Sequence, residues 1–378
     1  MRTSITQHGH QQWNAGTDPA RADTLNAYFG GRNNNLNLIR IVAASAVLVS
    51  HTYALTTGDP EQEPLVAQTG LSLGTFSVIV FFAISGLLIA RSFDRRSSFE
   101  HFAAARLLRL WPGLLVLLCL SAFVLGPVVT SLSLPAYWRD HATWTYVPRN
   151  LTLYFLQDTL PGVFGQNALG PQINGSLWSL FYEVVCYGVV VMLGQLGALR
   201  RGWGFAVFFA IAVIAQVWAA SHTPADGLLY RLRTLAFYGF PFALGIAAYV
   251  WRNSLPIRGW LALTIWLLPV ALITTAYEAT ALMIALAYTS YYMAFVPQGP
   301  TLYYNRAGDY SYGIYIYAFP VQQIFVHYFP KFSAAQHMAC AAPVVLLCAM
   351  ASWHGLESHA LAMASPLAKR LGAGTRST

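Results

Sequence analysis

About ten apolar segments, each close to the length needed to cross a bilayer, limit what this chain can fold into. About 20 residues of helix, at ~1.5 Å rise each, span the ~30 Å hydrocarbon core. The sequence therefore predicts an all-α, polytopic integral membrane protein with about ten transmembrane helices. A short break near Glu278 separates the seventh segment from the eighth, so nine is the alternative count. The approximate ranges are 37–56, 73–91, 107–130, 176–197, 203–221, 233–251, 258–275, 277–296, 311–329 and 335–363.

The composition agrees with a membrane protein. Of the 378 residues, 56% are hydrophobic and only 10% are charged, whereas soluble domains carry about 25% charged residues. The net charge of +8 is compatible with nucleic-acid binding, but basic cytoplasmic loops explain it in a multi-pass protein. We therefore expect membrane lipids, and no nucleic acid, as partners.

The basic residues predict an orientation in the membrane. With a cytoplasmic N-terminus, most of the 22 lysines and arginines fall at cytoplasmic ends of the segments. The opposite side holds only Arg139, Arg149, Arg231, Arg233 and Lys331. This asymmetry follows the positive-inside rule, so both termini are expected in the cytoplasm. The predicted domains are a polar, disordered tail over 1–35, one membrane domain over 36–364 and a short basic tail over 365–378.

The largest segment on the predicted outer side, 131–175, is rich in aromatic residues, glycine and proline. Long loops in compact proteins are often functional, and this composition suits sugar stacking or a lid. An aromatic belt at the membrane interface explains the same composition equally well.

The first apolar segment contains two residues that lipid disfavours, Arg40 and His51. Eleven residues separate them, so a helix places both on one face, roughly 16 Å apart along its axis. A neutral imidazole can take a proton from a hydroxyl under attack, which makes His51 a candidate general base. The alternatives are a histidine hydrogen-bonded to a neighbouring helix and an arginine that reaches the membrane surface as a topology anchor.

Arg106 and Arg109 stand three residues apart at the predicted cytoplasmic entry of the third segment. On a helix they share a face, and paired guanidinium groups bind phosphate oxygens well. The spacing therefore indicates a phosphate or diphosphate clamp. The alternative is the general accumulation of arginine at cytoplasmic helix ends.

Two acidic residues lie within or beside apolar segments. Glu183, in the fourth segment, needs a partner such as His51, an arginine or a proton, either for chemistry or as a structural ion pair. Asp309 or Ser311 could cap the ninth segment, and we expect a structural role there.

Five sequence runs, in order, match motifs of a known family. Over residues 35–371 the chain resembles the acyltransferase-3 membrane family, which includes O-antigen and exopolysaccharide O-acetyltransferases. The matching runs are Leu38 to Arg40 followed by His51, Phe81 to Ile89, Arg106 to Pro112, Ser176 to Glu183, and Gly308 to Tyr315. Two positions depart from the family pattern, because Ala318 stands where many members have histidine and Glu357 is followed by Ser-His rather than Arg-Pro.

The resemblance implies a bacterial inner-membrane enzyme that moves an acyl group, usually acetyl, to a hydroxyl of a glycan or lipid-linked saccharide. Acyl-CoA, usually acetyl-CoA, would be the cytoplasmic donor substrate, with no bound cofactor and no metal. His51 would be the catalytic base, and Arg40, Arg106 and Arg109 would bind the coenzyme A phosphates or hold the pore. Beyond the resemblance, we expect Glu183 to support the imidazolium or an arginine. Supporting positions within the matched runs are Ser85, Ser176, Trp178 and Tyr312.

A second function class also fits the intramembrane charges. A secondary transporter or flippase for a sugar or lipid-linked substrate would use a buried Arg, His and Glu set for proton coupling. Such carriers often contain inverted repeats, and the sequence has no obvious internal repeat. A catalytically degenerate relative acting as a sensor is disfavoured, because Arg40 and His51 are both present.

Overall fold

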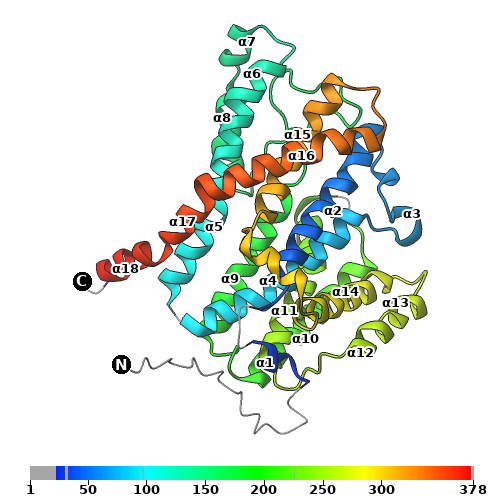
Figure 1. The fold of residues 1–378 in the computed structure, drawn as a ribbon, viewed down its shortest axis with the longest axis vertical. Helices are drawn as coiled ribbons and strands as arrows, with labels where there is room; N and C mark the ends of the chain where they lie inside the picture. Colours follow the sequence, from blue (N-terminus) through cyan, green and yellow to red (C-terminus); the bar gives the residue numbers. More distant parts are fainter. Residues whose placement is uncertain (1–22, 30–32, 97, 225, 376–378) are drawn as a thin grey trace, which may run out of the picture.

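The computed structural model describes residues 23–29, 33–96, 98–224 and 226–375, and its only extended pairing over these residues is one isolated bridge between Thr24 and Pro256 (Figure 1). The long helices are α2 (Leu36–Thr57), α4 (Leu73–Arg96), α5 (Phe99–Leu120), α9 (Trp178–Gln195), α10 (Gly202–Ser221), α11 (Gly227–Val250), α14 (Glu278–Phe295), α15 (Ser311–Tyr328) and α16 (Ala334–Ser352). The shorter elements are α1 (Leu25–Tyr28), η2 (Pro60–Gln62), α3 (Val66–Thr69), η3 (Ser121–Leu125), α6 (Gly126–Val129), α7 (Leu134–Arg139), α8 (His141–Leu151), α12 (Gly259–Thr264), α13 (Leu267–Ala271), η4 (Pro300–Arg306), η5 (Trp353–Glu357), α17 (Ser358–Ala362) and α18 (Ala364–Thr375). The predicted all-helical class is confirmed.

The described residues contain seven helical segments long and apolar enough to cross a membrane, or eight if α14 and η4, which meet at 87°, form one bent span. The expected number of about ten is therefore not confirmed. The range 258–275 is divided between the short helices α12 and α13. Helix α15 is long enough, but its tyrosines and the fully buried Gln322 and Gln323 belong to an interior helix rather than a lipid-facing one.

Helix α4 lies at the centre of the bundle, where it packs against α2, α9, α11 and α14. Its contact with α11 depends on two glycines. A Cβ atom on Gly86 would lie 2.0 Å from the carbonyl oxygen of Phe242, and one on Gly245 would lie 2.2 Å from that of Ala83. Small residues let membrane helices approach closely, and here they bring the two backbones into direct contact.

Helix α15 packs between α2 and α16. The Gln322 amide donates hydrogen bonds to the Leu48 carbonyl at 2.9 Å and to the Thr52 hydroxyl at 2.6 Å, both on α2. Interhelical hydrogen bonds of this kind satisfy polar groups where water is scarce. Helix α2 is therefore fixed on one side by α4 and on another by α15.

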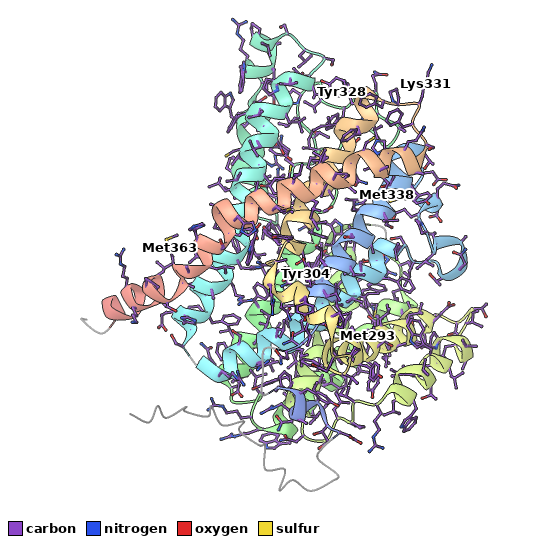
Figure 2. The ribbon with its side chains drawn as sticks, in the orientation of Figure 1. Met293, Tyr304, Tyr328, Lys331, Met338 and Met363 are labelled. Atoms are coloured by element: carbon purple, nitrogen blue, oxygen red, sulfur yellow. The ribbon has the colours of Figure 1, made fainter. Side chains whose placement is uncertain are left out.

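The C-terminal helices α16, α17 and α18 form one continuous helical segment that runs diagonally across the molecule (Figure 1). The π-helical turn η5 interrupts it and turns Glu357 inward, so that this side chain is only 1% exposed. Met363, labelled on the same segment in Figure 2, is exposed. Within the predicted C-terminal tail, the residues up to Thr375 are helical, and α18 packs on α5.

Part of the predicted N-terminal tail is ordered. Helix α1 buries Leu25 completely, and its amide donates a hydrogen bond to the Leu255 carbonyl at 2.9 Å. Residues 1–22 and 30–32 of that tail lie outside the described residues.

The segment 131–175 contains α7 and α8 followed by an irregular stretch. Trp138 and Trp144 cluster with Phe123 of η3, with ring centroids 5.8 to 6.3 Å apart. The irregular stretch is attached to α15, because the Asn174 amide donates to the Ile316 carbonyl at 2.8 Å and the Asn167 amide donates to Gln323. This loop therefore covers one face of the interior helix.

Candidate active site

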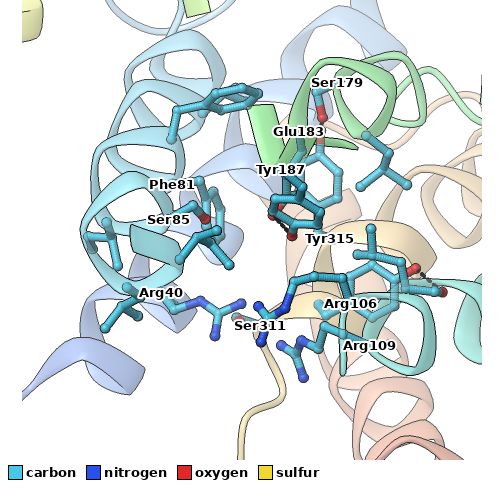
Figure 3. A pocket seen from close by; sticks show the side chains of 18 residues that line it. Arg40, Phe81, Ser85, Arg106, Arg109, Ser179, Glu183, Tyr187, Ser311 and Tyr315 are labelled. Atoms are coloured by element: carbon cyan, nitrogen blue, oxygen red, sulfur yellow. Dashed lines mark hydrogen bonds between the residues drawn. The ribbon is translucent and has the colours of Figure 1, made fainter. Parts of the chain in front are cut away.

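A cavity between α2, α4, α5, α9 and α15 brings together most of the residues singled out in the sequence. It contains about 800 Å³ of space between protein atoms, part of it open to the outside. Figure 3 shows three guanidinium groups converging at one end of it, with Glu183 and Ser85 above them. The predicted site residues that line it are Arg40, Ser85, Arg106, Arg109, Glu183 and Tyr312.

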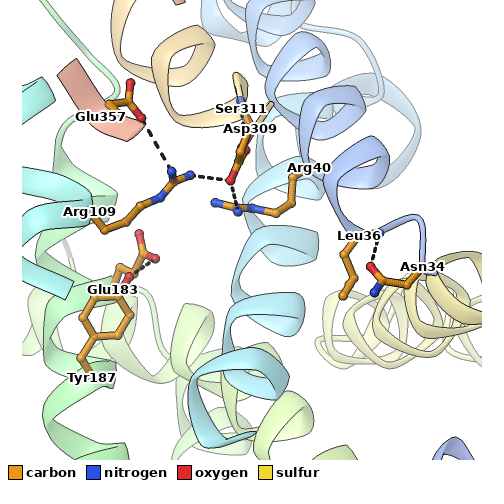
Figure 4. Close-up of polar contacts among 9 residues, drawn as sticks. All are labelled: Asn34, Leu36, Arg40, Arg109, Glu183, Tyr187, Asp309, Ser311 and Glu357. Atoms are coloured by element: carbon orange, nitrogen blue, oxygen red, sulfur yellow. Dashed lines mark hydrogen bonds and ion pairs between the residues drawn. The ribbon is translucent and has the colours of Figure 1, made fainter. Parts of the chain in front are cut away.

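Asp309 is the centre of the ion cluster beside this cavity (Figure 4). Its Oδ2 atom accepts hydrogen bonds from Arg40 at 2.5 Å and from Arg109 at 2.7 Å. Its Oδ1 atom accepts from the hydroxyl and the amide of Ser311, the first residue of α15, although Tyr310 rather than Asp309 occupies the cap position. Burial by itself would raise the pKa of Asp309, but the guanidinium groups of Arg109 and Arg40 hold that pKa well below its ordinary value.

Arg109 has a second carboxylate partner. Its Nη1 atom lies 3.7 Å from Oε2 of the buried Glu357, whose other oxygen accepts a hydrogen bond from Ser352 at 2.7 Å. The guanidinium group also lies over the rings of Tyr312 and Trp353. A buried cation needs such compensation, so Arg109 is anchored by the fold.

Sequence reasoning missed Asp309 and Glu357 as site residues. It assigned Asp309 a capping role, whereas the structure gives it two ion pairs. The sequence did contain a signal for these partners. A buried arginine requires a carboxylate, and few acidic residues adjoin the apolar segments, so those few were the candidate partners.

Arg106 lines the same cavity but has no carboxylate partner among the described residues. Its Nε atom is buried and makes no hydrogen bond. The guanidinium group lies 5.9 Å from the ring centroid of Phe102 and 5.8 Å from that of Tyr187. Of the two arginines predicted as a clamp, Arg106 is thus the one with free hydrogen-bonding capacity.

Glu183 is paired with a tyrosine. The Tyr187 hydroxyl donates to Glu183 Oε1 at 2.5 Å, one helical turn away on α9. The side chain lines the arginine cavity, so the structure places it near the predicted clamp rather than beside His51.

The remaining supporting positions have packing contacts. The Tyr312 hydroxyl donates to the Leu110 carbonyl at 2.7 Å, which joins α15 to α5. The buried Ser176 accepts a hydrogen bond from Tyr315 through its carbonyl at 2.8 Å. Trp178 packs against Tyr182 and Tyr238, outside the residues that line the cavity.

His51 lies farther along α2 and does not line the arginine cavity. Its ring is partly exposed and meets the edge of Phe319, with ring centroids 5.3 Å apart. The Nδ1 atom is buried without a hydrogen-bond partner among the described residues. An imidazole left free of structural hydrogen bonds is available for proton transfer.

The acidic residue near His51 is Glu63, which follows η2. It accepts a hydrogen bond from Ser50, the neighbour of His51 on α2. Ser50 in turn accepts a hydrogen bond from the Gly74 amide at 2.9 Å. Sequence reasoning missed Glu63, because the connection between the first two spans carried no recognisable pattern.

Comparisons with known proteins identify the family of the chain. A family model described as an acyltransferase domain matches residues 33–354. An O-acetyl transferase of Shigella phage Sf6 is 30% identical over 354 residues, which cover 89% of this chain and 98% of the phage protein. Nodulation protein 10 of Rhizobium leguminosarum bv. viciae is 32% identical over 197 residues, or 50% of this chain and 51% of that protein. No solved structure matches the chain significantly.

The family match includes α2, the arginine cavity and the whole of α15. Since it spans most of the sequence, and a relative of nearly the same length matches from end to end, the chain belongs to the acyltransferase-3 family of membrane enzymes.

Proposed function

We propose that this enzyme transfers an acetyl group from acetyl-CoA to a hydroxyl of a glycan acceptor, with His51 as the general base. The similarity to an O-acetyl transferase and to a nodulation protein supports an O-acetyl group and a glycan-type acceptor. The observation that carries the proposal is a cavity with three arginines at one end, one of which, Arg40, shares helix α2 with His51, whose Nδ1 atom has no hydrogen-bond partner among the described residues.

The arginine end suits the phosphates of coenzyme A. Within the described part of the chain, Arg106 has no carboxylate to compete with a phosphate, whereas Arg40 and Arg109 share Asp309. Guanidinium groups bind phosphate oxygens in a planar, two-pronged geometry. We infer that Arg106 makes the primary phosphate contact and that Asp309 holds the two other arginines in position around it.

The extent of the cavity lining supports a path for the donor along α4. Its lining follows α4 from Ile89 to Val78, which corresponds to roughly 16 Å of helix. Gly74, one turn beyond Val78, lies against Ser50. An extended pantetheine arm along this wall would carry its thioester from the arginines towards His51.

The reaction then needs one proton transfer in each direction. His51 takes the proton of the acceptor hydroxyl as its oxygen attacks the thioester carbonyl, and the carbon–sulfur bond breaks as the tetrahedral intermediate collapses. The coenzyme A thiolate leaves and receives the proton back from the imidazolium. Glu63 is placed to stabilise the imidazolium, and Glu183 to balance charge at the arginine end.

The positive-inside pattern supports an orientation in which the arginine cavity opens to the cytoplasm, where acetyl-CoA is made. In this orientation both termini are cytoplasmic and the protein lies in a bacterial inner membrane. His51 then lies towards the outer half of the membrane, which suits an acceptor presented from the far side, including one attached to a lipid carrier.

The test is acetyl transfer from labelled acetyl-CoA to candidate glycans by purified protein in lipid nanodiscs. We expect His51→Ala to abolish transfer without loss of folded protein, while His141→Ala, on the exposed surface of α8, retains parental activity. Full transfer by His51→Ala would refute the base assignment. Transport of a glycan without acetylation by the parent protein would instead favour a carrier.

A further inference from the structure

A second cavity lies at the other end of α2 from the arginines. It contains about 660 Å³ of space between protein atoms and is lined by Thr56 of α2, the 166–168 stretch of the outer loop, and residues from the end of α15 to the start of α16. This is the end of the molecule where Figure 2 labels Tyr328 and Lys331. Nothing in the reaction described above uses this cavity.

His337 is the residue that points to a ligand here. It is only 1% exposed, and its buried ring nitrogens make no hydrogen bond of normal geometry among the described residues, although the Phe325 backbone lies close to the ring. The ring also meets the edge of the Phe325 side chain, with centroids 6.0 Å apart. The Phe325 backbone can serve one nitrogen at most, and burying a polar group without a hydrogen bond costs about 1–3 kcal/mol, so the imidazole keeps hydrogen-bonding capacity for a ligand in the cavity.

The start of α16 holds His337 rigidly. Ser333 and Gln336 form a reciprocal capping box, in which the Ser333 amide donates to Gln336 Oε1 at 2.9 Å. A capping box fixes the first helical turn. His337 follows directly, so its ring is presented to the cavity by an ordered helix.

The lining is polar and aromatic but carries no Lys, Arg, Asp or Glu among the described residues. Gln166 supplies an amide, whereas the Asn167 amide is already bonded to Gln323, and the rings of Phe329 and Phe332 stack at 4.8 Å with an interplanar angle of 19°. The arginine cavity has the opposite chemistry. A neutral, hydroxyl-rich ring fits this lining, since its hydroxyls can pair with amides and imidazoles while its apolar face packs on an aromatic ring.

The cavity is close to His51 along both helices that flank it. Thr56 is five residues beyond His51 on α2, or ~7.5 Å along the axis. On α15, Phe319 contacts His51 and Val326 lines the cavity, and Leu55 is buried between them. A ligand seated here would therefore lie one layer of apolar side chains away from the proposed base.

We propose that this cavity binds a neutral sugar residue of the acceptor glycan through His337 and Gln166. The assignment to the acceptor rests on the proposed function, whereas the binding of a neutral sugar does not. Because the cavity is offset from His51, the seated sugar is a neighbour of the residue that carries the reacting hydroxyl. The enzyme would then recognise a unit of at least two sugars.

Saturation-transfer NMR on the full-length protein in nanodiscs, without maltoside detergent, tests the site. The probes are glucose, galactose, rhamnose and N-acetylglucosamine, with glucose 1-phosphate as a charged comparator. We expect transfer to at least one neutral sugar and a loss of affinity of about tenfold or more in His337→Phe, which removes both nitrogens. Gln166→Ala, on an exposed side chain, should weaken binding without any effect on folding, and His141→Phe should bind as the parent does.

Two results would overturn the proposal. One is the absence of saturation transfer to any neutral sugar by the parent protein, and the other is parental binding by both His337→Phe and Gln166→Ala. A third result is possible: the parent protein transfers no acetyl group, yet it binds a sugar and both variants weaken that binding. This result would refute the proposed function and support the sugar site. His51→Ala separates the two readouts, because it should bind sugar normally while transferring nothing.

Discussion

The Asp309→Asn substitution tests whether one carboxylate holds the arginine cavity together. The change keeps the side-chain volume and an oxygen for Ser311 but removes the charge that faces Arg40 and Arg109. Two unit charges at these N–O separations of 2.5 and 2.7 Å attract by on the order of 5 kcal/mol at an effective dielectric constant of ~20. Desolvation offsets much of that attraction, but removing one partner from a buried pair still costs about 3–5 kcal/mol.

The measurement is the midpoint of unfolding of the purified protein, followed by reaction of a dye with the cysteines that become exposed. The matched control is Asp23→Asn, which removes the carboxylate of the half-exposed ion pair with Arg258 at 3.1 Å. Exposed pairs contribute about 0–1 kcal/mol, so Asp23→Asn should change the midpoint little. Equal midpoints for the two variants would refute the reasoning. The pair Asp309→Asn and Arg40→Gln should also be less than additive, because Arg40 loses its partner in either single variant.

The same comparison has a defined pH dependence. Because the folded-state pKa of Asp309 is held below its ordinary value, its charge stabilises the fold at every pH above the unfolded value of ~3.9. The difference in stability between parent and Asp309→Asn should therefore be constant from pH 7 to pH 5 and shrink only as the pH falls below ~4. A difference that declines between pH 7 and pH 5 would contradict the assigned ion pairs.

Two further substitutions test the donor site and the helix packing. Arg106→Gln should raise the KM for acetyl-CoA about ten- to a hundredfold, since a hydrogen bond to a charged group contributes about 1.5–3 kcal/mol. The unfolding midpoint should stay the same, because Arg106 has no carboxylate partner among the described residues. An unchanged KM would show that Arg106 does not bind the phosphates. Gly86→Ala should lower the free energy of unfolding by about 1–3 kcal/mol, because the added Cβ atom would lie 2.0 Å from the Phe242 carbonyl oxygen. Gly188→Ala, with nothing within 4 Å, is the control, and equal stability of the two alanine variants would contradict the packing of α4 on α11.

Features that depend on local periodicity could be predicted from the sequence. The apolar lengths predicted most of the membrane helices, because burial in lipid acts on every residue of a span. A helix has a fixed rotation per residue, so the spacing of Arg40 and His51 predicted that they share one face of α2. The spacing of Arg106 and Arg109 predicted in the same way that both reach one cavity. The count of about ten is not confirmed, because 258–275 is divided between α12 and α13 and because the polar residues of α15 are buried among other helices.

The amino-acid sequence by itself determined the all-helical membrane class, the family and the residues worth testing. The tertiary structure alone decided which of them meet. Asp309 joins Arg40 across 269 residues of chain, η5 turns Glu357 towards Arg109, and α9 places Glu183 with Tyr187 while Glu63 lies near His51. The buried His337 is likewise visible only where α15, α16 and the outer loop converge. The reason is physical: helix periodicity is encoded within a few residues, whereas the partner of a buried charge is set by how distant helices pack.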